Sequence, residues 1–192
     1  MKRINSYKKY NFSSIKIVFV LSLLILTMFL LVKLWPHEIR KSNFIDKIAP
    51  EALELKKQTG ILPSIIIGQA ILESNFGKSE LAIKANNLFG IKGDYKGNSV
   101  KMPTIEYANK TRYTIEAEFR AYPDWKSSLI DHTKLFLKGN SWNENQYDEV
   151  VDATNYKKAA YALKKNSYST DPKYPEKLID IIEQYKLDKY DH

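Results

Sequence analysis

Residues 62–77 read LPSIIIGQAILESNFG, a pattern that predicts a buried helix ending at a charged residue. Pro63 falls near the first turn, where proline fits a helix, and the residues that follow are apolar on almost every side. Glu73 then stands where a hydrophobic residue would be expected, and Gly77 follows as the turn that ends the helix. A helix of this composition belongs in the centre of a domain, so Glu73 is expected at the edge of the core.

The predicted surroundings of Glu73 disfavour a charged carboxylate. Apolar neighbours on the same helix displace water, which raises the pKa of the carboxyl group. The C-terminal end of the helix dipole acts in the same direction, because it disfavours negative charge. A carboxyl group that stays protonated near neutral pH is suited to general acid catalysis. The alternative is a surface glutamate that forms an ion pair with a nearby lysine such as Lys78.

The remainder of the chain predicts a mostly helical α+β domain. Residues 44–59 carry apolar side chains at helical spacing, and Asp124, Asn155 and Asp171 each precede a further helical pattern as expected N-caps. Residues 99–120 instead alternate between polar and apolar positions, which predicts a small β-hairpin that turns near residues 108–110. The residues between the central helix and the hairpin are expected to form a loop rich in Gly and Asn.

Four stretches of the sequence stand in a fixed order: residues 62–93, MPTIEY (102–107), FRAYPDW (119–125) and SYSTDPKYPEKL (167–178). Together they resemble the glucosaminidase domain of glycoside hydrolase family 73, over about residues 45–187. Members of this family are bacterial peptidoglycan hydrolases with a lysozyme-like fold. The resemblance implies a lysozyme-like domain in which the hairpin is a small β-lobe.

The resemblance also implies roles for particular positions. Glu73 matches the catalytic acid, Glu106 matches the second carboxylate on the β-lobe, and Tyr168 matches a tyrosine that lines the active site. Three further positions are implied to bind substrate: Asn87, Phe89 and Phe76. Phe76 stands where many members have tryptophan, which keeps an aromatic ring but changes the surface available for stacking on a sugar. Independently of the resemblance, His132 lies on an apolar helix face and is expected to be packed rather than catalytic.

The activity implied is hydrolysis of the β-1,4 bond after N-acetylglucosamine in peptidoglycan glycan strands, of the endo-β-N-acetylglucosaminidase type. Inverting, retaining and substrate-assisted mechanisms all remain open at this point. Two alternatives also remain: a muramidase or lytic transglycosylase, and a non-catalytic glycan-binding or scaffold protein tethered to the membrane. No cofactor or metal is expected, because the chain has no cysteine and its three histidines are scattered.

The positive net charge of +8 is concentrated at the N-terminus. Residues 1–41 contain eight basic residues and one acidic residue, so the rest of the chain is nearly neutral. Such a distribution argues against a nucleic-acid partner and for a segment that flanks a membrane.

An uncharged apolar run from Ile17 to Val32, bounded by Lys16 and Lys33, is expected to be an uncleaved signal anchor. The expected organisation is a cytoplasmic basic segment (1–16), a transmembrane helix (17–35), a short linker (36–43) and an extracellular catalytic domain (44–192). The expected location is therefore the cell membrane, with a single crossing and the N-terminus in the cytoplasm. The sequence does not identify a membrane-protein partner.

Overall fold

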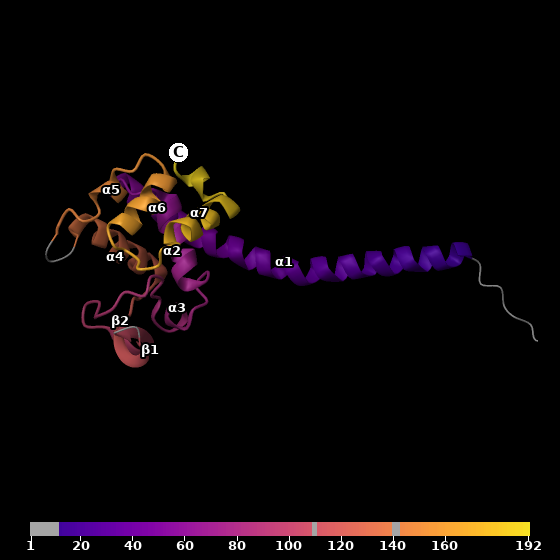
Figure 1. The fold of residues 1–192 in the computed structure, drawn as a ribbon, viewed down its shortest axis with the longest axis horizontal. Helices are drawn as coiled ribbons and strands as arrows, with labels where there is room; N and C mark the ends of the chain where they lie inside the picture. The colour runs from indigo at the N-terminus through magenta and orange to yellow at the C-terminus, as the bar shows by residue number, and fades with distance from the viewer. Residues whose placement is uncertain (1–11, 109–110, 140–142) are drawn as a thin grey trace, which may run out of the picture. The chain divides into compact units, whose positions relative to one another are not determined.

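The structure is a computed structural model that describes residues 12–108, 111–139 and 143–192, with the backbone alone for residues 12–21, 29–40, 105–108 and 111–112. The chain divides into two compact units, Met1–Asn43 and Phe44–His192. The elements are α1 (Phe12–Thr59), α2 (Pro63–Ser74), α3 (Glu80–Ala85), β1 (Ser99–Ala108), β2 (Thr111–Arg120), α4 (Trp125–Lys138), α5 (Asp148–Val151), α6 (Tyr156–Lys165), α7 (Tyr174–Gln184) and the 3₁₀-helix η1 (Leu187–Tyr190) (Figure 1). The prediction of a mostly helical α+β domain with a small hairpin is confirmed.

The centre of the second unit is α2, as its composition predicts. Every residue from Pro63 to Ile71 is buried, and the helix packs against α6, α7 and η1. At its N-terminus, the backbone N–H and the hydroxyl of Ser64 both donate to the Asp191 carboxylate, at 2.9 and 2.6 Å. Asp191 therefore caps the helix that carries Glu73. The N-terminal end of the helix dipole also stabilises the negative charge of its carboxylate.

Two of the three predicted N-caps are confirmed. Asp124 accepts a hydrogen bond from the backbone of Ser127 at the start of α4, and Asn155 accepts one from Lys158 at the start of α6. The prediction for Asp171 is wrong, because α7 begins at Tyr174 with Lys173 in the N-cap position. The Asp171 side chain instead accepts from the Lys173 backbone N–H within the preceding turn.

The two-stranded sheet is antiparallel, and its register pairs Ser99 with Arg120 at the base and Ala108 with Thr111 at the tip. The predicted turn residues 109–110 lie outside the described residues. Near the base of the hairpin, Met102 and Phe119 are buried. Nearer the tip, Tyr113 and Ile115 point to the same face of β2 as Phe119 but are 42% and 39% exposed. In Figure 1 the hairpin lies beside α3, at the opposite end of this unit from α5, α6 and α7. Helix α3 was not predicted.

The predicted anchor, residues 17–35, is helical and forms part of α1. Its side chains are described for residues 22–28 alone, and residues 1–11 of the predicted cytoplasmic segment lie outside the described residues. Over the part of the chain that the structure describes, no helix provides an apolar stretch long enough to cross a membrane.

Candidate active site

Glu73 lies in the last turn of α2, where part of the residue meets solvent while protein atoms surround its carboxyl group. The Tyr174 hydroxyl donates a hydrogen bond to Glu73 Oε1 at 3.0 Å. Surrounding protein atoms displace water from the carboxyl group and raise its pKa above the usual value, and the bond from Tyr174 partly opposes this increase. Among the described residues Glu73 forms no ion pair, so the alternative pairing with Lys78 is not observed. The position suits a proton donor that still meets solvent.

The chain turns sharply immediately after Glu73. Asn75, Phe76 and Gly77 have positive φ angles of 50°, 59° and 70°, so three consecutive residues are left-handed. Ser74 supports this turn, because its hydroxyl donates to the Ala70 carbonyl at 2.5 Å and accepts from the Gly77 backbone N–H at 2.8 Å. The result is that α2 ends one residue after the carboxyl group, which leaves Glu73 at the surface of an otherwise buried helix.

Tyr174 and Gln69 are site residues that the sequence analysis missed. Tyr174 is 4% exposed at the start of α7, and Gln69 is fully buried on α2, one turn before Glu73. The Gln69 side-chain amide donates to the Tyr174 hydroxyl oxygen at 3.0 Å. The only sequence signal was the spacing of Gln69 and Glu73, four residues apart on one helix, since Tyr174 is brought to them by the fold.

Tyr168, predicted at the site, lies in the same group of aromatic side chains as Tyr174. Their ring centroids are 5.6 Å apart, and the Tyr168 hydroxyl is 3.1 Å from His132 Nε2. Burial raises the pKa of Tyr168, with further contributions from the nearby Tyr174 and Glu73. The structure therefore brings Tyr168 close to Glu73 through Tyr174.

His132 is fully buried, as predicted from its apolar helix face. Burial lowers its pKa to about 3, which keeps the imidazole neutral at physiological pH. Its ring stacks on Phe89 with centroids 3.7 Å apart and an interplanar angle of 4°. Phe89, 7% exposed, thus serves as a packing partner behind the tyrosines, and it presents little surface to a ligand.

Asn87 is 1% exposed, and its side chain is occupied by backbone groups. Its Nδ2 donates to the carbonyls of Ile91 and Arg120, both at 2.9 Å, and its Oδ1 accepts from the backbone N–H groups of Phe89 and Ile91. These bonds shape the loop after α3 and join it to the end of β2. Asn87 thus holds the backbone of the segment that was predicted to line the site.

Phe76 is half-buried and packs edge-on against Phe44 and Tyr185, with ring centroids 6.0 and 5.2 Å away. These contacts place it in an aromatic cluster beside the turn that follows Glu73. Phe76 thus keeps part of its surface exposed, three residues after Glu73 in the sequence.

Glu106 lies in β1 opposite Tyr113 of β2, and its side chain is outside the described residues. The base of its hairpin is attached to α4 through charged and polar side chains. Arg120 forms an ion pair with Asp131 at 2.5 Å, and the Tyr122 hydroxyl donates to the same carboxylate at 2.8 Å. The strands that carry position 106 are therefore held to the helical part at their base.

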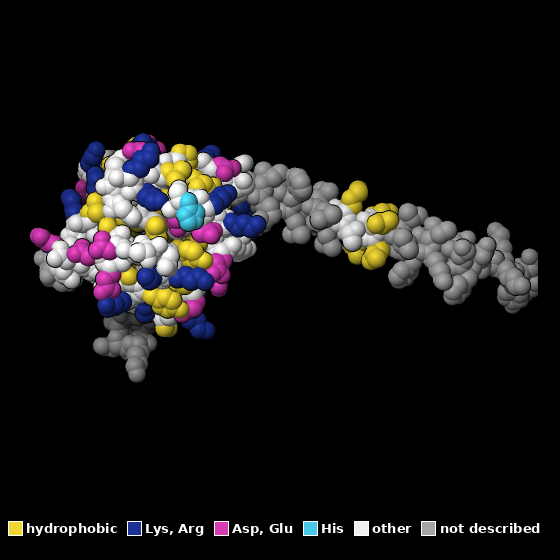
Figure 2. Space-filling model, turned by 90° about the horizontal axis from the view of Figure 1, so that it is seen from above, with side chains coloured by type: hydrophobic (Ala, Val, Ile, Leu, Met, Phe, Trp, Pro, Cys, Tyr) yellow, Lys and Arg dark blue, Asp and Glu magenta, His cyan; other side chains and the backbone are white. Residues whose placement is uncertain are grey.

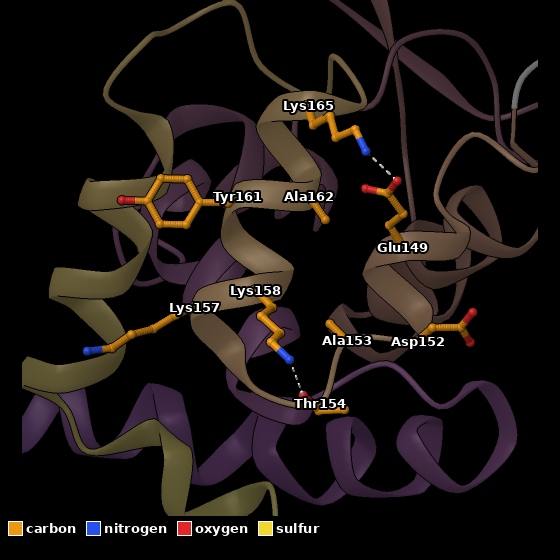
Figure 3. A pocket seen from close by; sticks show the side chains of 9 residues that line it. All are labelled: Glu149, Asp152, Ala153, Thr154, Lys157, Lys158, Tyr161, Ala162 and Lys165. Carbon is orange, nitrogen blue, oxygen red and sulfur yellow. Dashed lines mark hydrogen bonds and ion pairs between the residues drawn. The ribbon is translucent and has the colours of Figure 1, made fainter.

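A surface hollow of about 680 Å³ lies between α5 and α6, away from Glu73 and Tyr174. Figure 3 shows that its lysines are engaged: Lys165 forms an ion pair with Glu149, and Lys158 donates to Thr154. Lys157 points away from these groups and pairs with Glu183. On the face of the second unit visible in Figure 2, basic and acidic side chains are similarly interspersed. In the described part of the chain, no cluster of His, Asp or Glu side chains is arranged to hold a metal ion.

Comparison with known proteins gives one matching family model, Glucosaminidase, described as mannosyl-glycoprotein endo-β-N-acetylglucosaminidase, over residues 49–187. The exo-glucosaminidase LytG of Bacillus subtilis is 51% identical over 148 residues, which cover 77% of this chain and 52% of that protein. A probable N-acetylmuramidase of Lactococcus lactis is 40% identical over 77% of this chain and 34% of its own length. The chain thus spans about half or less of these curated relatives.

Among solved structures, the catalytic domain of the autolysin Auto from Listeria monocytogenes aligns with a TM-score of 0.75 and 42% identity. The alignment covers 79% of this chain and 88% of that domain. The family match over residues 49–187 includes Gln69, Glu73, Tyr168 and Tyr174.

Proposed function

Because the chain belongs to the glucosaminidase family, we propose that it is a bacterial cell-wall hydrolase that cleaves the β-1,4 bond after N-acetylglucosamine in peptidoglycan glycan strands. The observation that carries this proposal is Glu73, a carboxyl group with a raised pKa that accepts a hydrogen bond from a buried tyrosine. This geometry supports a general acid, and the glucosaminidase and N-acetylmuramidase names of the relatives support a glycan of N-acetylglucosamine and N-acetylmuramic acid as the substrate.

In the proposed mechanism, Glu73 donates its proton to the leaving-group oxygen as the C1–O bond breaks and an oxocarbenium-like transition state forms. Glu106 activates the attacking water or stabilises the developing positive charge. Its support is its match to the family's second carboxylate, on a hairpin whose base is attached to the helical part. A third route uses the substrate's own 2-acetamido group as the nucleophile.

The anomer formed first, observed by NMR, separates inversion from retention. Loss of cleavage in Glu106→Gln tests the assignment of Glu106 as the second carboxylate.

The bond that is cleaved separates the proposal from a muramidase or a lytic transglycosylase. Purified peptidoglycan is digested, the products are reduced, and their ends are identified by mass spectrometry. N-acetylglucosamine at the reducing end is the expected result. N-acetylmuramic acid at that end would indicate a muramidase, and 1,6-anhydro ends would indicate a lytic transglycosylase.

In the same digest, disaccharides released from the first minutes indicate exo cleavage, whereas a mixture of long fragments indicates the proposed endo cleavage.

A non-catalytic glycan-binding protein on the same fold is the alternative of another class. It requires binding to cell walls without release of new reducing ends. The presence of both Glu73 and Glu106 favours an enzyme. A sedimentation assay with insoluble walls, run beside a reducing-end assay, distinguishes the two functions.

We also propose that residues 17–35 anchor the protein in the cytoplasmic membrane, with residues 1–16 inside and the catalytic domain outside. The support is the apolar run between Lys16 and Lys33 and the basic residues before it. Large apolar side chains are also 55–66% exposed within this run: Leu23, Leu24, Ile25, Leu26 and Met28. Protease added to intact protoplasts is expected to digest the catalytic domain. Protection of that domain until the cells are lysed would contradict this topology.

A further inference from the structure

The hydrogen bond between Tyr174 and Glu73 joins residues that are 101 positions apart in the sequence. Tyr174 is only 4% exposed, so its hydroxyl is available to Glu73 and has little surface for a substrate. Through this hydrogen bond, the tyrosine is expected to affect glycan cleavage by way of the Glu73 carboxyl group. That makes Tyr174 a candidate positioning residue for the acid.

Gln69 favours this direction of the hydrogen bond. Its Nε2 can only donate, and it donates to the Tyr174 hydroxyl oxygen at 3.0 Å. The oxygen of Tyr174 is thereby used as an acceptor, and its own proton points to Glu73 Oε1. Gln69 is fully buried on the same helix as Glu73, so both partners of the tyrosine are held by one rigid element.

Tyr174 keeps its hydroxyl proton near neutral pH, so it remains a donor there. Its pKa is raised far above the usual value by burial, with a further contribution from the nearby Glu73. When Glu73 is protonated, Oε1 already accepts from the tyrosine, which leaves Oε2 as the oxygen that carries the acid proton. When the proton has left, the same bond stabilises the carboxylate.

We propose that Gln69 and Tyr174 act as a positioning pair that keeps the transferable proton of Glu73 on Oε2 and stabilises the carboxylate left behind. This inference rests on the proposed function of Glu73. As the C1–O bond breaks, its electron pair stays on the leaving oxygen, which takes the Oε2 proton. A water molecule adds its hydroxyl to C1 and gives its remaining proton to the base that activates it, and exchange with solvent returns a proton to Glu73.

The first test is Tyr174→Phe, with the pH dependence of kcat and KM measured on soluble glycan fragments. Without the tyrosine hydroxyl, kcat is expected to fall about tenfold while KM stays within about twofold. The alkaline limb of the pH profile is expected to move to higher pH, because the removed bond lowers the pKa of Glu73. Gln69→Leu is expected to change both quantities in the same direction, but less, since the tyrosine hydroxyl is then free to rotate.

The matched control is Tyr156→Phe. The Tyr156 hydroxyl also donates to a glutamate, Glu183, at 3.1 Å, and this pair is exposed on the surface. Its removal is expected to leave kcat, KM and the pH profile unchanged. Equal effects of Tyr156→Phe and Tyr174→Phe would overturn the proposal, because they would show a general response to the loss of a tyrosine hydroxyl.

A second measurement does not depend on activity. The Glu73 carboxyl carbon, labelled with ¹³C, is titrated by NMR in the wild type, Tyr174→Phe and Gln69→Leu, each checked for folding by circular dichroism. The pKa of Glu73 is expected to be higher in both variants. An unchanged pKa would overturn the inference. A lower pKa would also overturn it, because it would mean that Glu73 donates to Tyr174. If Glu73→Gln cleaved peptidoglycan normally, the proposed function would fail whatever the titration showed.

Discussion

Glu73 occupies a position that opposes its own ionisation. Protein atoms displace water from the carboxyl group, and the C-terminal end of α2 disfavours negative charge. The hydrogen bond from Tyr174 offsets part of this effect without providing a positive partner. A side chain kept for stability alone would gain from a neutral amide here, whereas a proton donor requires the carboxyl group.

The stability of the Glu73→Gln variant tests whether the surroundings of Glu73 oppose its ionisation. The pKa of Glu73 is raised in the folded state, so ionisation destabilises the fold as the pH rises above the unfolded value of about 4.3. Glu73→Gln is therefore expected to raise Tm by roughly 1–2 °C at pH 7, and the gain should disappear near pH 4. Differential scanning calorimetry at both pH values measures it.

The control for this measurement is Glu80→Gln, at an exposed glutamate that forms an ion pair with Lys84 at 2.6 Å. No increase in Tm is expected for that variant. If Glu73→Gln were no more stable than the wild type at pH 7, ionisation of Glu73 would not destabilise the fold.

At the scale of single residues, the sequence was informative where local context decides the chemistry. Burial of α2 and its end after Glu73 followed from one continuous stretch, so the carboxyl group could be identified and its raised pKa predicted. Tyr174 could not be identified, because it is one of 13 tyrosines and its contact with Glu73 spans 101 positions. The burial of Asn87 and Phe89 likewise depends on partners in β2 and α4.

At the scale of elements, the turn after α2 depends on Gly77. Its φ of +70° is a left-handed conformation, and an added Cβ would lie 2.7 Å from the Trp125 ring and 3.0 Å from the Phe44 ring. Gly77→Ala therefore combines backbone strain with overpacking, and it is expected to lower the free energy of unfolding by about 2–4 kcal/mol. Urea denaturation measures this loss.

Gly93 provides the matched comparison, since it has a φ of +98° and no atom within 4 Å of an added Cβ. Gly93→Ala is expected to cost roughly 1 kcal/mol, from backbone strain alone. Equal losses in the two variants would mean that contact with the aromatic rings contributes nothing at Gly77.

The helix starts show why some elements could be predicted and others not. Asp124 and Asn155 are followed directly by helical patterns, and each caps the helix as expected. Asp171 has the same side-chain chemistry, but its turn and its ion pair with Lys177 hold it two residues before the helix N-cap. Helix α3 has only six residues, too few for a periodic pattern to be recognised.

At the scale of the whole molecule, the two compact units predict separable roles. Residues 44–192 contain the described core and Glu73, and residues 1–43 contain the predicted anchor. The full chain is expected to sediment with membranes after cell fractionation, whereas a chain of residues 44–192 stays in the soluble fraction and releases the same glycan products. Membrane association of the shorter chain would show that the anchor lies elsewhere.

The central claim is that Glu73 is the general acid of a peptidoglycan glucosaminidase. The most direct test is the rate at which new reducing N-acetylglucosamine ends appear in purified peptidoglycan, for the wild type and Glu73→Gln side by side. Circular dichroism first confirms that both proteins are folded. The rate is expected to fall by about 10²–10⁴-fold in the variant, the range typical for loss of general acid catalysis. A Glu73→Gln protein that releases these ends at the wild-type rate would contradict the claim.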